Sequence, residues 1–347
     1  MATIYWSGAI DTDIDDYRNY VTGENADPSS ATIADNSGDF SGDNVIFQSL
    51  AVSNVSNNPT VNANETFNSI RIDSGCTLTG NSSFSITVDG EADGAGTTTS
   101  GYAVDIDGAL GTNVNLIITT ADTTNLDIIP SSGNVHDLTI NLGDAARIAK
   151  IQTGGPTLTG DLTITSGQLS TENNALTVTG TTTIGPNSGV ADQATLTCGS
   201  GTISLGASET SSYALRITQG GTFTGGTGAH TIGSLEMVNN AAAKCTLTSG
   251  DTTISSERTS ADNHLVIGSS TTFAHGSGTI ITTFAGTTHM DVDKTLNNLT
   301  INHASAVHKL SDSLDLAGNL TITAGEFNPN GRNGLAGTFL RFVEKPA

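Results

Sequence analysis

Two pairs of aspartates, each separated by one residue, have the residue type and spacing for acid–base chemistry. The pairs are Asp105 with Asp107 and Asp291 with Asp293, and both stand in short apolar segments. If those segments are strands, residues two apart project from one face at roughly 7 Å. Two carboxyl groups at about that separation can act as acid and base in glycoside hydrolysis.

Few aromatic side chains accompany these aspartates. Sugar-cleaving grooves usually stack sugar rings on aromatic residues, and the only nearby candidates are Tyr102 and His289. We therefore expect both pairs to lie on a solvated outer face, with Val104, Ile106 and Val292 pointing inward. No hydrolysis of polysaccharide is expected from them.

A run of aspartates near the start of the chain imitates a calcium loop. Asp11, Asp13 and Asp15 match its first ligand positions, but its sixth and twelfth positions hold Asp16 and Thr22 instead of Gly and Glu. The sequence therefore favours a solvated acidic turn, with a divalent cation such as calcium as the alternative. No other cofactor is predicted.

The histidines and cysteines show no ligand or catalytic spacing. Seven histidines are scattered from His136 to His308, without a zinc or triad pattern. Cys76, Cys198 and Cys245 are odd in number and far apart, and each adjoins a Thr-Leu or Leu-Thr pair. They are predicted to be small apolar residues of strands.

Composition excludes several classes of partner. Twelve basic against 34 acidic residues give a net charge of −22, which disfavours binding to nucleic acid and to anionic membranes. No apolar run is long enough to span a membrane. Aromatic residues make up only 5% of the 347 residues, with 40 glycines, a composition that suits a thin core lined by small branched side chains.

The element that must position all these residues is a short strand that recurs along the chain. Its pattern is a polar residue, Leu or Ile, a polar residue, then Val or Ile, with successive copies starting 20 to 24 residues apart. Leu and Ile should face inward and Thr outward. The predicted inward residues are Leu138, Ile140, Leu162, Ile164, Leu299, Ile301, Leu320 and Ile322, and the predicted outward residues are Thr139, Thr163, Thr300 and Thr321.

Stacking such strands turn upon turn buries a continuous narrow core. The predicted fold is therefore all-β: a single-stranded parallel β-helix, or β-solenoid, from about residue 46 to 325, with glycine-bearing bends at its corners. An antiparallel sandwich is the competing fold. It would need hairpin signals such as Asn-Gly, which occur only at Asn330-Gly331 and Asn333-Gly334.

The two ends differ from the middle in composition. Trp6 and three of the five tyrosines lie within the first 20 residues, and Phe327, Phe339 and Phe342 cluster near the other end. A solenoid exposes a strand edge at each end and needs caps there. We predict an N-terminal cap or attachment module at 1–45, the β-helix at 46–325 and a C-terminal cap at 326–347.

The opening segment resembles that of a broad group of β-helix surface proteins. The resemblance lies in Tyr5-Trp6-Ser7-Gly8, Arg18-Asn19-Tyr20 and Gly42-Asp43-Asn44-Val45-Ile46-Phe47. It resembles the Trp-x-Gly opening of autotransporter-type bacterial surface proteins and of phage fibre and head-decoration proteins, with Tyr20 in place of their second Trp. The resemblance implies the fold and an extracellular or virion setting, not an activity.

The expected function is that of a non-enzymatic structural protein on the virion surface of a tailed phage. It would be a head-decoration protein or short fibre, homotrimeric, bound to capsid or tail proteins and able to meet host-surface glycans. Residues 1–16 lack a signal-peptide pattern, which favours the phage. A secreted bacterial adhesin or extracellular fibre subunit is the alternative, and a tailspike depolymerase the third candidate.

Attachment to a larger assembly is expected through residues 1–45. Tyr5, Trp6, Tyr17 and Tyr20 are the predicted anchors, because buried aromatics often dominate the binding energy of interfaces. The alternative is that Trp6 plugs the open end of its own coil.

Overall fold

Short strands with alternating apolar and polar side chains form nearly all of the regular structure. The computed structural model describes residues 2–27, 29, 40–51, 54–92, 101–111, 113–120, 123–128, 135–186, 193–256, 263–311 and 313–329, and the backbone of 335–336 and 339–342. These residues contain no α-helix, and their one helical turn is the 3-10 element η1 (Tyr17–Asn19). None of them belongs to a helix long and apolar enough to cross a membrane. The prediction of an all-β fold is confirmed.

The chain forms two compact units. Unit 1 comprises residues 1–163 and 167–170, and unit 2 comprises 164–166 and 171–347, so the division falls inside strand β15 (Leu162–Ser170). The predicted segments 1–45, 46–325 and 326–347 have their bounds elsewhere and stay a prediction. Most of the predicted C-terminal cap, including the side chains of Phe339 and Phe342, lies outside the described residues.

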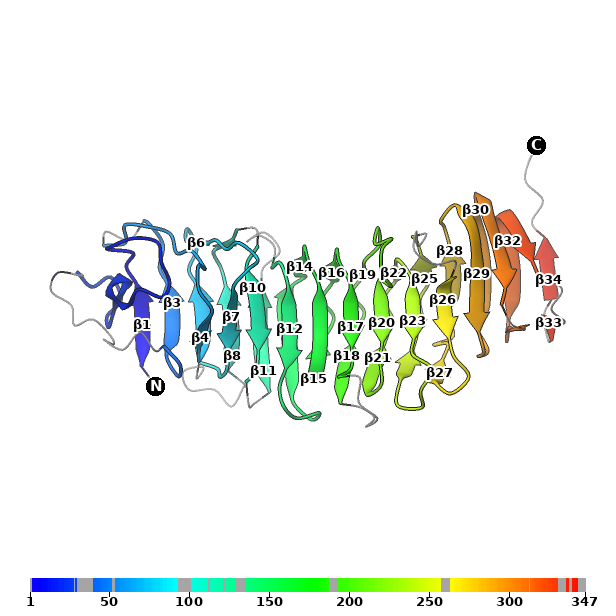
Figure 1. Cartoon of the computed structure of the whole chain (residues 1–347), viewed down its shortest axis with the longest axis horizontal. Coiled ribbons are helices and arrows are strands. Elements are labelled where there is room, and N and C mark those ends of the chain that lie inside the picture. Colours follow the sequence, from blue (N-terminus) through cyan, green and yellow to red (C-terminus); the bar gives the residue numbers. More distant parts are fainter. Residues whose placement is uncertain are drawn as a thin grey trace. The chain divides into compact units, whose positions relative to one another are not determined.

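In unit 1 the strands stack as parallel ladders, in which each strand pairs with one from the preceding turn of the chain (Figure 1). The longer ladder consists of β1 (Thr3–Trp6), β3 (Asn44–Phe47), β5 (Ser69–Ile72), β8 (Tyr102–Ile106), β11 (Thr124–Ile128) and β13 (Ile148–Gly154). The second consists of β4 (Glu65–Phe67), β7 (Ser85–Val88), β10 (Asn115–Ile118) and β12 (Leu138–Asn141). The remaining strands are β2 (Tyr20–Val21), β6 (Thr77–Leu78), β9 (Ala109–Leu110) and β14 (Thr157–Leu158).

Unit 2 repeats every three strands, so that its strands fall into three parallel columns. Column one holds β16 (Leu176–Val178), β19 (Ile203–Leu205), β22 (His230–Ile232), β25 (Thr252–Ile254), β28 (Thr279–Thr282), β30 (Asn298–Leu310), β32 (Asn319–Asn328) and β34 (Phe339–Phe342). Column two holds β17 (Thr182–Ile184), β20 (Leu215–Ile217), β23 (Leu235–Met237), β26 (Asn263–Ile267) and β29 (Gly286–Val292), and it continues into the second halves of the long strands β30 and β32. Column three holds β18 (Ala194–Thr197), β21 (Gly221–Thr224), β24 (Lys244–Thr246) and β27 (Thr272–Ala274), and a separate pair joins β31 (Leu314–Asp315) to β33 (Leu335–Ala336).

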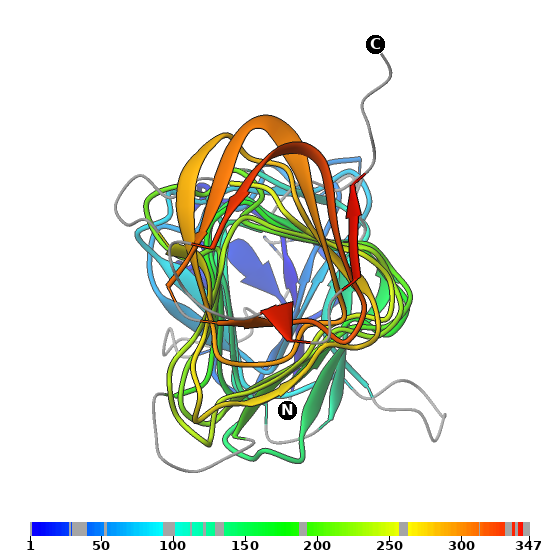
Figure 2. The same ribbon diagram turned by 90° about the vertical axis from the view of Figure 1, so that its right-hand side faces the viewer.

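From β16 to β27 the chain passes through the three columns in the same order on each turn. In Figure 2 the ribbons of successive turns of unit 2 overlie one another, as their parallel pairing requires. Antiparallel pairing occurs between β1 and β2 and at the bridge between Ala92 and Tyr102, whereas the ladders and columns described above are parallel. The antiparallel sandwich is therefore wrong, and the mostly parallel sheet fits a β-solenoid.

The predicted register of the core strands is confirmed at seven of its eight inward positions. Leu138, Ile140, Leu162, Ile164, Leu299, Ile301 and Leu320 are all 0 or 1% exposed. Thr139, Thr163, Thr300 and Thr321 are half-buried on the opposite face.

The prediction fails at Ile322, which is half-buried. It lies in β32, where exposure rises along the strand and Thr323, Gly325 and Glu326 are exposed. An inward side chain is excluded from water only where the neighbouring strands of its own column and of the other columns cover it. Along β32 the exposure of successive residues shows that this coverage decreases.

One corner of unit 2 is built from stacked glycines. Gly201, Gly228, Gly250 and Gly278 each precede a column-one strand, and each lies against the backbone of the turn before. A Cβ atom on Gly228 would collide with the carbonyl oxygen of Gly201, and one on Gly278 with that of Gly250. Glycine is therefore needed here for close backbone approach, as expected for a bend in a stacked coil.

Most inward side chains are apolar and stack in ladders, and histidine occupies a few of the inward positions. In column two, Leu215, Leu235, Leu265 and Met290 stack in register at 0 to 3% exposed. In column one the corresponding ladder contains His230 between Ile203 and Thr252. Neither ring nitrogen of His230 has a hydrogen-bond partner among the described residues.

Two further histidines share a buried aromatic ring. Phe284 stacks on His264 with ring centroids 4.3 Å apart and meets His308 edge-on at 5.3 Å. His308 Nε2 is hydrogen-bonded to Thr282 Oγ1 at 2.9 Å, and His264 Nδ1 to the Thr288 hydroxyl. Burial lowers the pKa of both His230 and His308 to about 4, because a charged imidazolium is poorly solvated in the core.

The register of β15 can be tested with a matched pair of variants. Ile164→Asp places an unpaired charge in a dry core and should cost more than about 4 kcal/mol, enough to prevent folding. Thr163→Asp, on the half-buried outer face, should cost less than about 1 kcal/mol. Circular dichroism and soluble yield report both, and normal soluble expression of Ile164→Asp would refute the register.

The buried histidines predict acid sensitivity. An unfolded His230 takes up its proton near pH 6.5, but the folded protein resists protonation until about pH 4. Its contribution to stability is thus complete above pH 6.5 and is lost as the pH falls toward 4, by about 3 kcal/mol.

His230→Phe should remove that dependence. The substitution nearly conserves volume and should change stability at pH 8 by less than about 1.5 kcal/mol. Between pH 6.5 and 4 the slope of unfolding free energy against pH, measured by urea titration, should decrease by about one proton. An unchanged slope would contradict the assignment.

Candidate functional site

Of the four predicted attachment residues, Trp6 and Tyr20 lie in the core, whereas Tyr5 and Tyr17 are partly exposed. Trp6 from β1 and Tyr20 from β2 are both fully buried, with ring centroids 5.3 Å apart in an edge-on contact. The aromatic cluster continues through Phe40, Phe47 and Phe67. These rings fill the interior of unit 1 beside its first strands.

The polar tips of both rings are also engaged inside the unit. Trp6 Nε1 donates to the Asn57 carbonyl oxygen at 2.7 Å, and the Tyr20 hydroxyl donates to that of Ile14 at 2.7 Å. Such full burial supports the alternative in which Trp6 fills the end of its own unit. Tyr5 and Tyr17 are half-buried and remain accessible, so docking through residues 1–45 stays a prediction that would depend on them.

Local hydrogen bonds occupy much of the acidic turn. Asp11 Oδ1 accepts from Asn19 Nδ2 at 2.7 Å and from the Asp13 backbone nitrogen at 3.0 Å. Asp16 forms an ion pair with Arg18, whose hydrogen bonds lower the pKa of the Asp16 carboxyl. In the described part of the chain no three His, Cys, Asp or Glu side chains are grouped as metal ligands, and calcium binding stays the untested alternative to a solvated acidic turn.

The three cysteines are free thiols and buried. Cys245 lies in β24, whereas Cys76 and Cys198 lie just outside strands. Burial raises the pKa of Cys76 and Cys198 to about 12 and also raises that of Cys245. All three therefore remain protonated and unreactive at neutral pH.

The two aspartate pairs do not have the strand geometry expected of them. β8 ends at Ile106 and β29 at Val292, so Asp107 and Asp293 follow the strand ends and are exposed. After Asp107 the chain turns at Gly108, which lies against the carbonyl oxygens of Asp73 and Cys76. Val104, Ile106 and Val292 are buried, as predicted.

Asp105 nevertheless belongs to a cluster that the ladder brings together. Parallel pairing places Arg71 beside Asp105, and Asp105 beside Asp127. Arg71 Nε lies 2.8 Å from Asp73 Oδ1 and 3.9 Å from Asp105 Oδ2. One arginine thus stands among several carboxylates.

The neighbouring carboxylates affect the pKa of the Asp105 carboxyl group. Partial burial, followed by repulsion from Asp107, raises the pKa of Asp105 to about 6, against the attraction of Arg71. A carboxyl group with this pKa can donate a proton near neutral pH, and such shifts are enriched at functional sites. Tyr102, with its half-buried ring, is the aromatic residue beside it.

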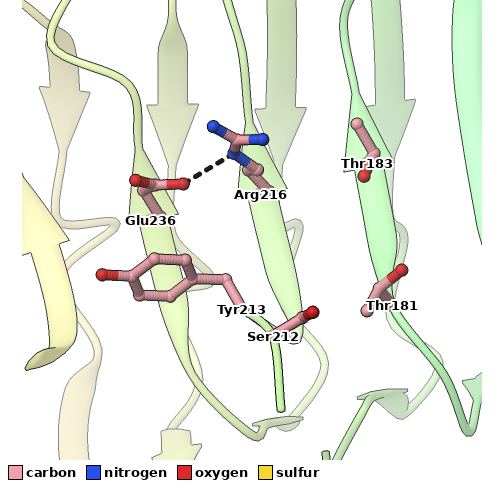
Figure 3. A pocket seen from close by; sticks show the side chains of 6 residues that line it. All are labelled: Thr181, Thr183, Ser212, Tyr213, Arg216 and Glu236. Atoms are coloured by element: carbon pink, nitrogen blue, oxygen red, sulfur yellow. Dashed lines mark hydrogen bonds and ion pairs between the residues drawn. The ribbon is translucent and has the colours of Figure 1, made fainter. Parts of the chain in front are cut away.

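A second arrangement, which the sequence analysis missed, is a polar depression on the outer face of column two in unit 2. Its volume is about 370 Å³, and Figure 3 shows the side chains that line it. They are Thr181, Thr183, Ser212, Tyr213, Arg216 and Glu236. The signal was present as two triplets with a charged centre, Leu215-Arg216-Ile217 and Leu235-Glu236-Met237.

An ion pair between two adjacent strands of column two forms part of the lining of this depression. Arg216 and Glu236 are register partners on β20 and β23, and Arg216 Nε donates to Glu236 Oε2 at 2.6 Å. Thr183 pairs with Arg216 from the other side. The arginine side chain is 51% exposed and that of the glutamate 22%, so the pair contributes little to stability and leaves the guanidinium facing solvent.

The carboxylate cluster predicts a stabilising substitution. Asp105 ionises in the folded protein near pH 6 and in the unfolded chain near pH 4. Its charge therefore destabilises the fold above pH 6, and the penalty disappears below pH 4.

Asp105→Asn should raise the unfolding free energy at pH 7 by about 1 kcal/mol, allowing for partial exposure. The gain should vanish at about pH 3, where Asp105 is protonated in both states. Denaturant titration at both pH values measures it, and Asp251→Asn, at an exposed position outside the carboxylate cluster, is the control. A loss of stability at pH 7 would mean that the attraction of Arg71 outweighs burial and repulsion.

Neither the carboxylate cluster nor the polar depression can be assigned through similarity to another protein. No protein-family model, curated protein or solved structure matches the chain. The chemistry open to each therefore follows from its own residues: proton donation near pH 6 at Asp105, and hydrogen bonding at Arg216 and Glu236.

Proposed function

We propose that the chain is a non-enzymatic structural protein on the surface of a tailed-phage virion, as a head-decoration protein or short fibre. In this proposal each unit is a closed, single-stranded parallel β-helix, and the protein assembles as a homotrimer bound to capsid or tail proteins. The observation that carries the proposal is the parallel ladder structure of both units. Stacked coils give a stiff scaffold whose outer face can vary without disturbing its core.

The start of the chain supports the same role. β1 ends at Trp6, the first residue of the Trp-x-Gly opening, and pairs in parallel with β3, so the chain enters the ladder just before that motif. The half-buried Tyr5 and Tyr17, with the exposed Ile10 and Leu50, supply apolar surface in this region. Such groups suit contact with a larger assembly.

Two other functions use the same fold. A secreted bacterial adhesin or extracellular fibre subunit would place the protein outside the cell or on its surface. A tailspike depolymerase is the third candidate, and the raised pKa of Asp105 beside Asp107 is the observation that favours it. That candidate requires a measurable depolymerase activity that Asp105→Asn or Asp291→Asn abolishes.

Immunogold electron microscopy tests the proposed location. Antibodies against the purified full-length chain should label the surface of particles released by lysis of the source culture. Antibodies adsorbed with the same chain are the control. Label confined to intact cells would instead support the adhesin, and unlabelled particles would refute the virion role.

A further inference from the structure

We propose that the polar depression of unit 2 binds a neutral saccharide ring, with the Arg216–Glu236 pair as its hydrogen-bonding anchor (Figure 3). This inference goes beyond the virion role and does not depend on it. The depression lies on the outer face of column two and is lined only by polar and aromatic side chains.

The anchor is oriented before any ligand arrives. Glu236 fixes Arg216 through its Nε, and Nη1 and Nη2 have no hydrogen-bond partner among the residues that the structure describes. Glu236 Oε1 likewise has none within the described part of the chain. Two donor nitrogens, with four N–H groups between them, and one acceptor oxygen are therefore presented together, and holding them in place reduces the entropy lost on binding.

Hydroxyl groups complete the lining. Within the described residues, the side chains of Thr183 and Ser212 make no hydrogen bond, and each can donate or accept. A sugar presents neighbouring hydroxyls with the same dual capacity. Each hydroxyl can then accept from the guanidinium or donate to the carboxylate, which an apolar ligand cannot do.

Tyr213 supplies the apolar part of the site. Its half-buried ring lines the depression together with Glu236, and in Figure 3 one face of the ring is turned toward the viewer. Aromatic faces bury the apolar face of a ring-shaped ligand at little entropic cost. The volume of about 370 Å³ is near the lower end for small-ligand sites, which suits one sugar ring.

Charge favours a neutral sugar over an acidic one. Glu236 already compensates Arg216 at 2.6 Å, so the depression offers no net positive charge. The chain as a whole carries a net charge of −22, which repels polyanions at a distance.

Saturation-transfer NMR with the full-length chain tests the proposal. The probes are the methyl glycosides of glucose, galactose, mannose and rhamnose, and at least one should bind with a dissociation constant of roughly 1 mM. Arg216→Ala and Tyr213→Ala should each weaken that binding by about tenfold. Thr253→Ala, at a half-buried outward position of β25, is the matched control and should bind like the wild type.

A charge-swapped variant separates recognition from structure. Arg216→Glu combined with Glu236→Arg retains an ion pair between the same rungs but exchanges its donors and acceptor. It should melt at the wild-type temperature and lose saccharide binding.

Three results would each overturn the proposal. The first is that none of the four glycosides binds the wild type. The second is that binding survives Arg216→Ala, Tyr213→Ala and the swap unchanged. The third is that methyl glucuronide or N-acetylneuraminate binds more tightly than every neutral glycoside.

Discussion

Parallel backbone hydrogen bonding between successive turns of the chain is the constraint on which the rest of the structure depends. It holds neighbouring strands about 4.8 Å apart and in register, so every inward side chain stacks on another from the turn before. The ladder Leu215, Leu235, Leu265 and Met290 shows the result in unit 2. The same spacing excludes a Cβ atom at the corner formed by Gly201, Gly228, Gly250 and Gly278.

On the outer face the same constraint assembles polar groups. Arg216 and Glu236 are 20 residues apart and meet because β20 and β23 are adjacent rungs. Arg71 meets Asp105 in unit 1 through the pairing of β5 with β8. The sheet faces therefore carry the charged clusters, and a functional group is placed by register more than by loop conformation.

Much of the fold follows from the sequence, because alternation within a strand is a local property. The segments Asp137-Leu138-Thr139-Ile140 and Asn298-Leu299-Thr300-Ile301 show which side chains face inward, and these are buried as predicted. Register between strands depends on the length of the intervening loops, which varies from turn to turn. For that reason the pairing of Arg216 with Glu236 was not predicted.

The alternation of apolar and polar residues also did not predict where strands end or how deeply the aromatic side chains are buried. Asp107 continues the alternation of Tyr102–Ile106, but the turn at Gly108 places it past the end of β8. Trp6 and Tyr20 have the residue types of interface anchors, yet they are fully buried against Phe47 and Phe40. Residue type alone does not distinguish an aromatic that fills a core from one that meets a partner.

The length of β30 and β32 has a consequence for folding kinetics. These strands pair at Leu299–Asn302 with Leu320–Ala324 and again at Val307–Lys309 with Glu326–Asn328. A single chain closure of 21 residues thus yields two stretches of ladder, and β30 itself gains two stretches from the preceding turn by pairing with both β28 and β29. Because closure entropy limits the rate at which non-local strands pair, we expect the turns that contain β30 and β32 to pair before the turns of shorter strands in unit 2. The preceding turns can then add one at a time to an edge that already offers hydrogen bonds.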